Sequence, residues 1–149
     1  MTFEHDVFVS YAHLDDAALV EGQKGWVANL HRALEIRVGQ LLGKSPHIWR
    51  DPKLQGNDLF AETLIELLKR VAVLVSVVTP RYVRSEWTTR ELLEFCKVAE
   101  QQGVETQHKA RVFKVLKTPV PLEQQAPVLR SLLGYEFFKV DPESGRVRE

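Results

Sequence analysis

Trp87 and Glu91, in the stretch SEWTTRELLEFC over 85–96, have types and a spacing that suggest chemistry. Residues four apart in a helix lie on the same face, so the indole would cover the carboxylate. An anion in that position suits the wall of a cleft better than a core face. The alternative is a Trp packed on the edge of a sheet beside a solvated Glu, and the spacing alone leaves both open.

The rest of this helix indicates where the pair lies. At about 100° per residue, one side of the helix is apolar and would pack on a sheet. Its members are Leu92, Phe95, Cys96 and Ala99. Trp87 and Glu91 lie roughly 80° to 120° from the centre of that side. We therefore expect the pair on the rim of the packed face, with the carboxylate covered but not fully buried.

The elements that must position this helix follow from apolar periodicity. Short runs rich in β-branched residues predict strands at 6–11, 47–50, 71–78, 111–117 and 135–140. Helical patterns alternate with them at 26–42, 58–69, 86–101 and 122–133. Asn57 and Ser85 are candidate N-caps, and Gly43 and Gly103 are candidate helix ends. The alternation predicts a flavodoxin-like three-layer α/β sandwich, with a five-stranded parallel sheet and helices on both faces.

In such a sheet, ligands bind beyond the carboxyl ends of the strands. Four stretches follow those ends: SYAHLDD, RDPKLQGND, TPRYVRSEW and TPVPLEQQ.

Composition excludes several classes of protein. The 20 Lys and Arg balance 20 Asp and Glu, and no basic stripe suits nucleic acid. No targeting segment and no apolar run of the ~20 residues that a membrane span needs is present, so we expect a cytoplasmic protein. Cys96 is the only cysteine, and the five His residues lack metal-ligand spacing, so no metal is predicted. We expect one domain over 1–141 and a polar tail over 142–149 that leads into a further, regulatory domain.

Three stretches together resemble the motifs of Toll/interleukin-1 receptor (TIR) domains: DVFVSYAH, IWRDPKLQGND and SEWTTREL. They occur in the family's order over nearly the whole chain, and three spaced motifs are more specific than one. TIR domains of the enzymatic branch, bacterial members included, cleave NAD⁺ between nicotinamide and ribose, and the Glu of their W-x-x-x-E motif is catalytic. The resemblance therefore implies that Glu91 is catalytic, and that NAD⁺ is a substrate and no cofactor is needed.

The resemblance also implies which residues bind the substrate. They are Trp87, Trp49, Ser10, Tyr11, Ala12, His13 and Asp51. Trp49 matches an aromatic residue that lies against the nucleotide, although a core position at a strand end is an equal alternative. Animal enzymatic members carry two Arg where this chain has Ala12 and His13.

A single carboxylate suits this reaction. Nicotinamide leaves NAD⁺ as a neutral molecule, so no general acid is required, in contrast to ordinary glycosidases with their two carboxyl groups. The ribosyl carbon becomes oxocarbenium-like as the bond lengthens, and a nearby anion stabilises that charge. The sequence leaves open whether the ADP-ribose is released linear, cyclised or transferred.

The loop after the second strand is the part that orders neighbouring subunits in TIR domains. Here it comprises Pro52, Lys53, Leu54, Gln55, Gly56 and Asn57. Pro stiffens its start and Gly permits unusual dihedral angles, so the loop can take two arrangements. We expect self-association to activate the enzyme, in bacterial immune or cell-death signalling.

Two other classes of α/β protein fit the sequence less well. A phosphorylated receiver domain shares the sheet, but the third strand ends in Thr79 and Pro80 where its phospho-acceptor would lie. A dinucleotide-binding Rossmann domain would need a Gly-rich turn. The remaining alternative is a non-enzymatic TIR interaction module that retains Glu91 for packing or surface charge.

Overall fold

The computed structural model describes residues 5–17, 22–50, 66–101, 111–132 and 134–148. Its main sheet has five parallel strands in the order β2-β1-β3-β4-β5, the strand order of flavodoxin-like folds. The strands are β1 (His5–Ser10), β2 (Ile48–Arg50), β3 (Val71–Val78), β4 (Val112–Leu116) and β5 (Gly134–Glu136). The predicted fold class is confirmed.

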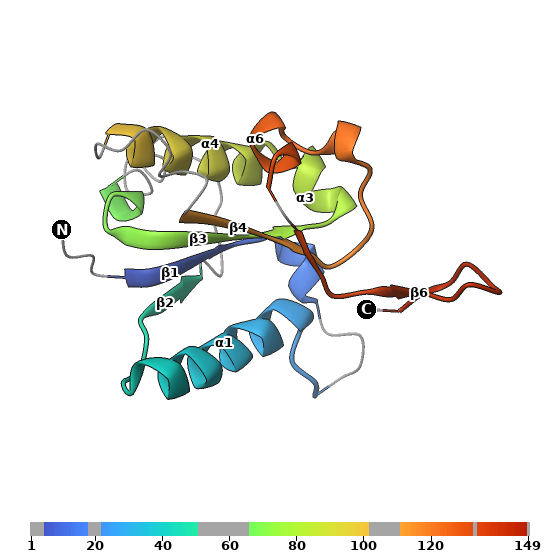
Figure 1. The fold of residues 1–149 in the computed structure, drawn as a ribbon, viewed down its shortest axis with the longest axis horizontal. Coiled ribbons are helices and arrows are strands. Elements are labelled where there is room, and N and C mark those ends of the chain that lie inside the picture. Colours follow the sequence, from blue (N-terminus) through green and yellow to red (C-terminus); the bar gives the residue numbers. More distant parts are fainter. Residues whose placement is uncertain (1–4, 18–21, 51–65, 102–110, 133, 149) are drawn as a thin grey trace.

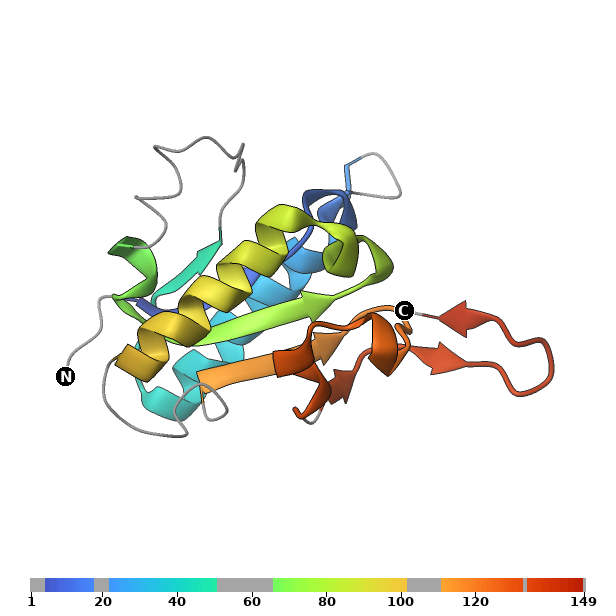
Figure 2. The ribbon, with the colours of Figure 1, turned by 90° about the horizontal axis from the view of Figure 1, so that it is seen from above.

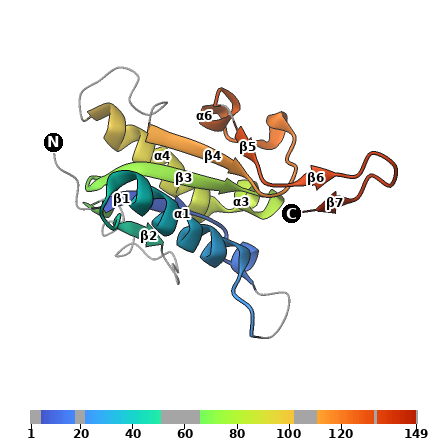
Figure 3. The ribbon, with the colours of Figure 1, turned by 60° about the horizontal axis from the view of Figure 1, so that its bottom comes forward.

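Helices cover both faces of this sheet (Figure 1). One face carries α1 (Trp26–Leu42), and the other carries α3 (Pro80–Arg84), α4 (Glu86–Gln101) and α6 (Pro127–Arg130). Figure 2 shows α4 running across the sheet, and Figure 3 shows α1 on the opposite side. Two 3₁₀ turns, η1 (His13–Asp16) and η2 (Leu122–Gln124), lie in the connections.

The core has one part on each face of the sheet. The larger part packs beneath α3, α4 and α6 and includes Phe8, Leu74, Leu92, Phe95 and Leu129, all fully buried. The smaller part packs beneath α1 and includes Val9, Tyr11, Val27 and Val77. Successive residues of a strand point to opposite faces, which explains why Phe8 and Val9 belong to different parts.

The longest predicted elements are confirmed with their bounds. The range 26–42 is α1, 71–78 is β3 and 86–101 is α4. Gly43 ends α1 in the left-handed conformation (φ 74°), as expected of a C-terminal glycine. Of the predicted helix 58–69, residues 66–68 are helical, Lys69 lies in a turn, and residues 58–65 lie outside the described residues, as do Asn57 and Gly103.

Two predicted elements differ in the structure. The helix expected over 122–133 is two short pieces, η2 and α6, because Pro127 lacks an N–H and can only begin a new helix. The strand expected over 135–140 is divided: β5 pairs with β4, whereas β6 (Lys139–Val140) pairs antiparallel with β7 (Val147–Arg148). Residues 142–148, expected to be a polar tail, thus form the turn and second strand of a hairpin that extends from the sheet (Figure 3).

Candidate functional site

Glu91 is held over the sheet by the way the chain enters α4. Ser85 is the predicted N-cap of α4, and its Oγ accepts a hydrogen bond from the Thr88 N–H (3.3 Å). The Thr88 hydroxyl donates to the carbonyl oxygen of Tyr82 (2.7 Å), at the end of α3. These contacts fix the first turn of α4, so that Thr88, Glu91 and Leu92 all face inward and are buried.

The Glu91 side chain is 3% exposed and is bonded to the end of β1. The Ser10 hydroxyl donates to Glu91 Oε1 (3.2 Å), and the same hydroxyl oxygen lies 2.9 Å from the Tyr82 hydroxyl oxygen. Ser10 and Tyr82 are themselves 0% and 2% exposed. Three oxygen-bearing side chains, from β1, α3 and α4, therefore form one buried hydrogen-bonded cluster, which we call the Ser10–Tyr82–Glu91 cluster.

Burial raises the pKa of the Tyr82 phenol well above its usual range, and the negative charge of Glu91 acts in the same direction. The hydroxyls of Ser10 and Ser76 oppose this shift. Ser76 lies next to Ser10 in the sheet register and is close enough to the phenol to affect its pKa. Its buried Oγ nevertheless makes no hydrogen bond of normal geometry among the described residues. The phenol therefore keeps its proton and remains a hydrogen-bond donor.

The expectation that Glu91 is covered but not fully buried is wrong. The packed face of α4 is wider than the four apolar residues used to define it, because Thr88 and Glu91 also face the sheet. The Ser10 hydroxyl on β1 lowers the free-energy cost of this burial, because a buried carboxylate is stable only when it is hydrogen-bonded. The opposite side of the helix is outward as predicted, with Leu93 52% exposed.

Ser10, Tyr11 and Ala12 are all buried, but they do not form one floor beneath a cleft. Ser10 bonds to Glu91. Tyr11 belongs to the core beneath α1, on the other face of the sheet, where the Arg50 guanidinium lies 5.8 Å from its ring centroid. The structure therefore places Ser10 beside Glu91 and Tyr11 on the opposite face of the sheet.

Trp49 lies in β2 with its ring stacked on Phe8 (centroids 4.8 Å apart, 18° between the planes). It is partly buried against the core beneath α4. One face of the indole is thus occupied by another aromatic ring, which favours the core alternative for this residue.

The other predicted site residues lie outside what the structure describes. Neither backbone nor side chain is described for Asp51, Pro52, Lys53, Leu54, Gln55, Gly56 and Asn57. For His13 and Trp87 only the side chain is undescribed, since their backbones lie in η1 and at the start of α4.

Tyr82 is the residue of the cluster that the sequence analysis missed. The signal was present in TPRY: Thr79 is a good N-cap, and Pro80 follows it at the first helical position. A short helix beginning there directs a residue two positions later back toward the sheet. The Thr79 Oγ1 accepts from the Tyr82 N–H (3.0 Å), and its own proton goes to Asp15 of η1.

Asp16 holds the junction between η1 and α1, on the face of the sheet opposite α4 (Figure 1). Its Oδ1 accepts from the Ala28 N–H (2.7 Å) and caps the helix, and its Oδ2 lies 3.8 Å from Arg50 Nη1. Gly25 precedes α1 so close to Asp16 that a Cβ there would overlap the Asp16 carbonyl oxygen. Glycine is therefore required at position 25 by the close approach of two backbone segments.

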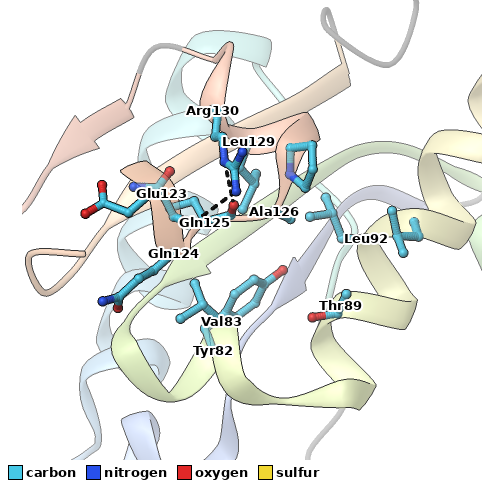
Figure 4. A pocket seen from close by; sticks show the side chains of 12 residues that line it. Tyr82, Val83, Thr89, Leu92, Glu123, Gln124, Gln125, Ala126, Leu129 and Arg130 are labelled. Carbon is cyan, nitrogen blue, oxygen red and sulfur yellow. Dashed lines mark hydrogen bonds between the residues drawn. The ribbon is translucent and has the colours of Figure 1, made fainter. Parts of the chain in front are cut away.

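The cavities bounded by described residues include the following three. The first, of about 210 Å³, lies between α3, α4 and the η2–α6 segment, with the Tyr82 ring on one side (Figure 4). The second, of about 400 Å³, is an open groove beside Leu93, and the third, of about 540 Å³, lies between α1 and Arg50. Glu91 lines none of these three.

Within the described ranges, no group of three or more His, Cys, Asp or Glu side chains is placed to hold a metal ion. None of the described helices is both long enough and apolar enough to cross a membrane.

The fold places the chain among flavodoxin-like α/β proteins with a buried carboxylate near the carboxyl end of β1. Within that class it is similar to TIR domains. No protein-family model and no curated protein matches the sequence. Among solved structures, the TIR domains of the activated Roq1 resistosome directly recognizing the pathogen effector XopQ align with 22% identity and a TM-score of 0.55, over 84% of this chain and 66% of that one.

Two structures of a metazoan TIR-STING receptor from C. gigas are also similar. The complex with 2′,3′-cGAMP aligns with 15% identity over 90% of this chain, and the other with 16% identity over 87%, each with a TM-score of 0.54. This chain spans about two thirds of the Roq1 chain and about a third of the TIR-STING chains (35% and 36%). At these identities the similarity establishes the fold, and the chain has the fold of a TIR domain.

Proposed function

We propose that the chain cleaves NAD⁺ at the nicotinamide–ribosyl bond, with Glu91 as the catalytic carboxylate. The observation that carries the proposal is the position of Glu91. Glu91 lies in α4, the second helix after the central strand β3, and is bonded to the last residue of β1. Ligands of this fold bind at the carboxyl ends of the strands.

The surroundings of Glu91 suit an electrostatic role. A carboxylate away from bulk water interacts more strongly with a nearby positive charge than an exposed one does. The ribosyl carbon gains such a charge as neutral nicotinamide leaves, so an oriented anion lowers the barrier without donating a proton. Products are nicotinamide and ADP-ribose, in linear or cyclic form. In this proposal Trp87, His13 and Asp51 contact the substrate, as the resemblance to TIR domains implies.

We further propose that this activity depends on self-association through the loop 52–57. A regulatory domain joined to this one would bring copies together in bacterial immune or cell-death signalling.

The second candidate function is a non-enzymatic TIR interaction module. The observation that favours it is also at Glu91: the side chain is 3% exposed and is bonded to Ser10. In that case the carboxylate only holds α4 to β1.

Glu91→Gln separates the two functions. Gln has the same shape and can still accept from Ser10, but it carries no charge. We expect nicotinamide release from NAD⁺, measured by chromatography, to fall ~10² to 10³-fold with the thermal unfolding midpoint nearly unchanged. The matched control is Glu94→Gln, one turn along on the same helix and half-buried, which should keep the native rate.

Native turnover by Glu91→Gln would remove Glu91 from the mechanism. A native chain that releases no nicotinamide at any protein concentration would leave the interaction module as the function.

A further inference from the structure

The direction of the hydrogen bonds in the Ser10–Tyr82–Glu91 cluster follows from simple counting. An ionised carboxylate only accepts, so the single Ser10 proton is donated to Glu91 Oε1. The remaining partner of Ser10, the Tyr82 hydroxyl at 2.9 Å, must then be the donor of that second bond. The relay therefore runs from the phenol to the serine hydroxyl to the carboxylate.

Tyr82 is anchored at both its main chain and its side chain. Its N–H is bonded to the Thr79 Oγ1, and its carbonyl oxygen accepts from the Thr88 hydroxyl one turn before Glu91. Its ring packs in the core beneath α4, on the inner wall of the 210 Å³ cavity (Figure 4). The phenolic oxygen therefore has little freedom to move away from Ser10.

We propose that Tyr82 is a positioning residue that orients the Glu91 carboxylate through the Ser10 hydroxyl. This inference rests on the proposed function and adds a residue that touches neither substrate nor reacting atoms. With the phenol in place, the serine proton has one direction left, toward the carboxylate. Without it, the serine hydroxyl can rotate, and the hydrogen bond that orients Glu91 Oε1 is held less firmly.

This proposal predicts an effect on turnover and not on substrate binding. Tyr82→Phe keeps the buried ring and removes only the hydroxyl, so the fold should persist. We expect kcat for NAD⁺ cleavage to fall about tenfold, which is the size of effect that one buried hydrogen bond produces, with KM unchanged. Ser10→Ala removes the bond to the charged group itself and should lower kcat about 30-fold.

A double-mutant cycle distinguishes positioning through Ser10 from a general loss of packing. If Tyr82 acts only through Ser10, the double variant Tyr82→Phe/Ser10→Ala should lose about 30-fold, no more than Ser10→Ala alone. Independent structural effects would multiply to about 300-fold. The matched control is Tyr135→Phe on β5, which removes the same hydroxyl from a side chain that is 52% exposed.

The outcomes separate this inference from the function on which it rests. A native chain that does not cleave NAD⁺ overturns both. Native cleavage with a multiplicative double variant, or with a Tyr82→Phe effect confined to KM, leaves the proposed function intact and overturns the role of Tyr82.

Discussion

Ser10, Tyr82 and Glu91 form a buried chain of hydrogen bonds that runs from a phenol through a serine hydroxyl to a carboxylate. The acceptor is satisfied by a hydroxyl, which in turn is satisfied by a phenol, and each group is at most 3% exposed. Such a cluster is costly if half-formed, since an unsatisfied buried polar group loses its hydration without compensation. The cluster therefore fixes the positions of α3 and α4 relative to β1 as well as the site.

Tyr82 should make stability depend on pH in the alkaline range. Burial raises its pKa above the usual value of 10.0. Above about pH 10 the unfolded chain loses this proton while the folded chain keeps it, so the free energy of unfolding falls as pH rises. Below pH 10 the contribution is fully present. In urea unfolding between about pH 8 and about pH 11, the stability advantage of the native chain over Tyr82→Phe should shrink.

Because the comparison is a difference between two chains, the other titrating groups cancel to first order. A difference that stays constant over the whole range would contradict the burial of an unionised phenol at position 82.

At the scale of elements, Lys114 of β4 holds the η2–α6 segment on the sheet. It is 3% exposed, and its ammonium group donates to Gln125 Oε1 and to the Leu129 carbonyl oxygen, each at 3.0 Å. Burial lowers the pKa of Lys114. This segment has too few residues for helices that are stable alone, so a buried cation with two acceptors gives it a defined position.

Replacing Gln125 should loosen that segment. Gln125→Leu removes an acceptor from the buried Lys114 ammonium and the donor to the Val120 carbonyl oxygen (3.0 Å). We expect the free energy of unfolding in urea to fall by about 2 kcal/mol. The control Gln124→Leu changes the exposed neighbour and should stay within about 0.5 kcal/mol of the native chain. Equal stability of the two variants would show that the Lys114–Gln125 contact contributes little.

Elements of strong periodicity were predictable from sequence, and those set by single residues were less so. The continuous apolar run of β3 and the amphipathic pattern of α4 gave the correct bounds, because burial over many residues decides them. The helix expected over 122–133 was interrupted by one proline. The strand expected over 135–140, YEFFKV, contains no Gly or Pro that would divide it, and only tertiary pairing shows that β6 leaves the sheet.

The site was predictable in part for the same reason. Helical spacing placed Glu91 near the packed face, but its burial depends on Ser10 and Tyr82, which are 81 and 9 positions away in the chain. Sequence spacing reports neighbours on one helix and not the hydroxyl groups that a neighbouring strand or helix supplies. The assignment of Glu91 as catalytic stays a prediction.

At the scale of the whole molecule, the fold is a three-layer sandwich with a hairpin, β6–β7, that extends beyond the sheet (Figure 2). The hairpin and its approach expose several large apolar side chains: Tyr135, Phe137, Val140 and Val147. Phe137 also contacts Trp26 of α1 edge-on, with the centroids 5.8 Å apart.

Dependence on association should be visible in the kinetics of the whole molecule. If a complete site forms only between copies, the specific activity of NAD⁺ cleavage rises with protein concentration, because the associated fraction rises by mass action. Initial rates over a dilution series, with sedimentation velocity on the same samples, measure both quantities. A specific activity that is flat while the sedimentation coefficient changes would exclude activation by self-association.

Gly25 has a consequence for natural and laboratory variation. Its neighbour is a peptide oxygen of Asp16, not a pliable side chain, so no repacking relieves the overlap that a methyl group would cause. Every missense change at this codon must therefore displace either the turn that contains Asp16 or the start of α1. Folded variants selected from a random mutagenesis library should therefore lack substitutions at position 25, although glycine bears no functional group.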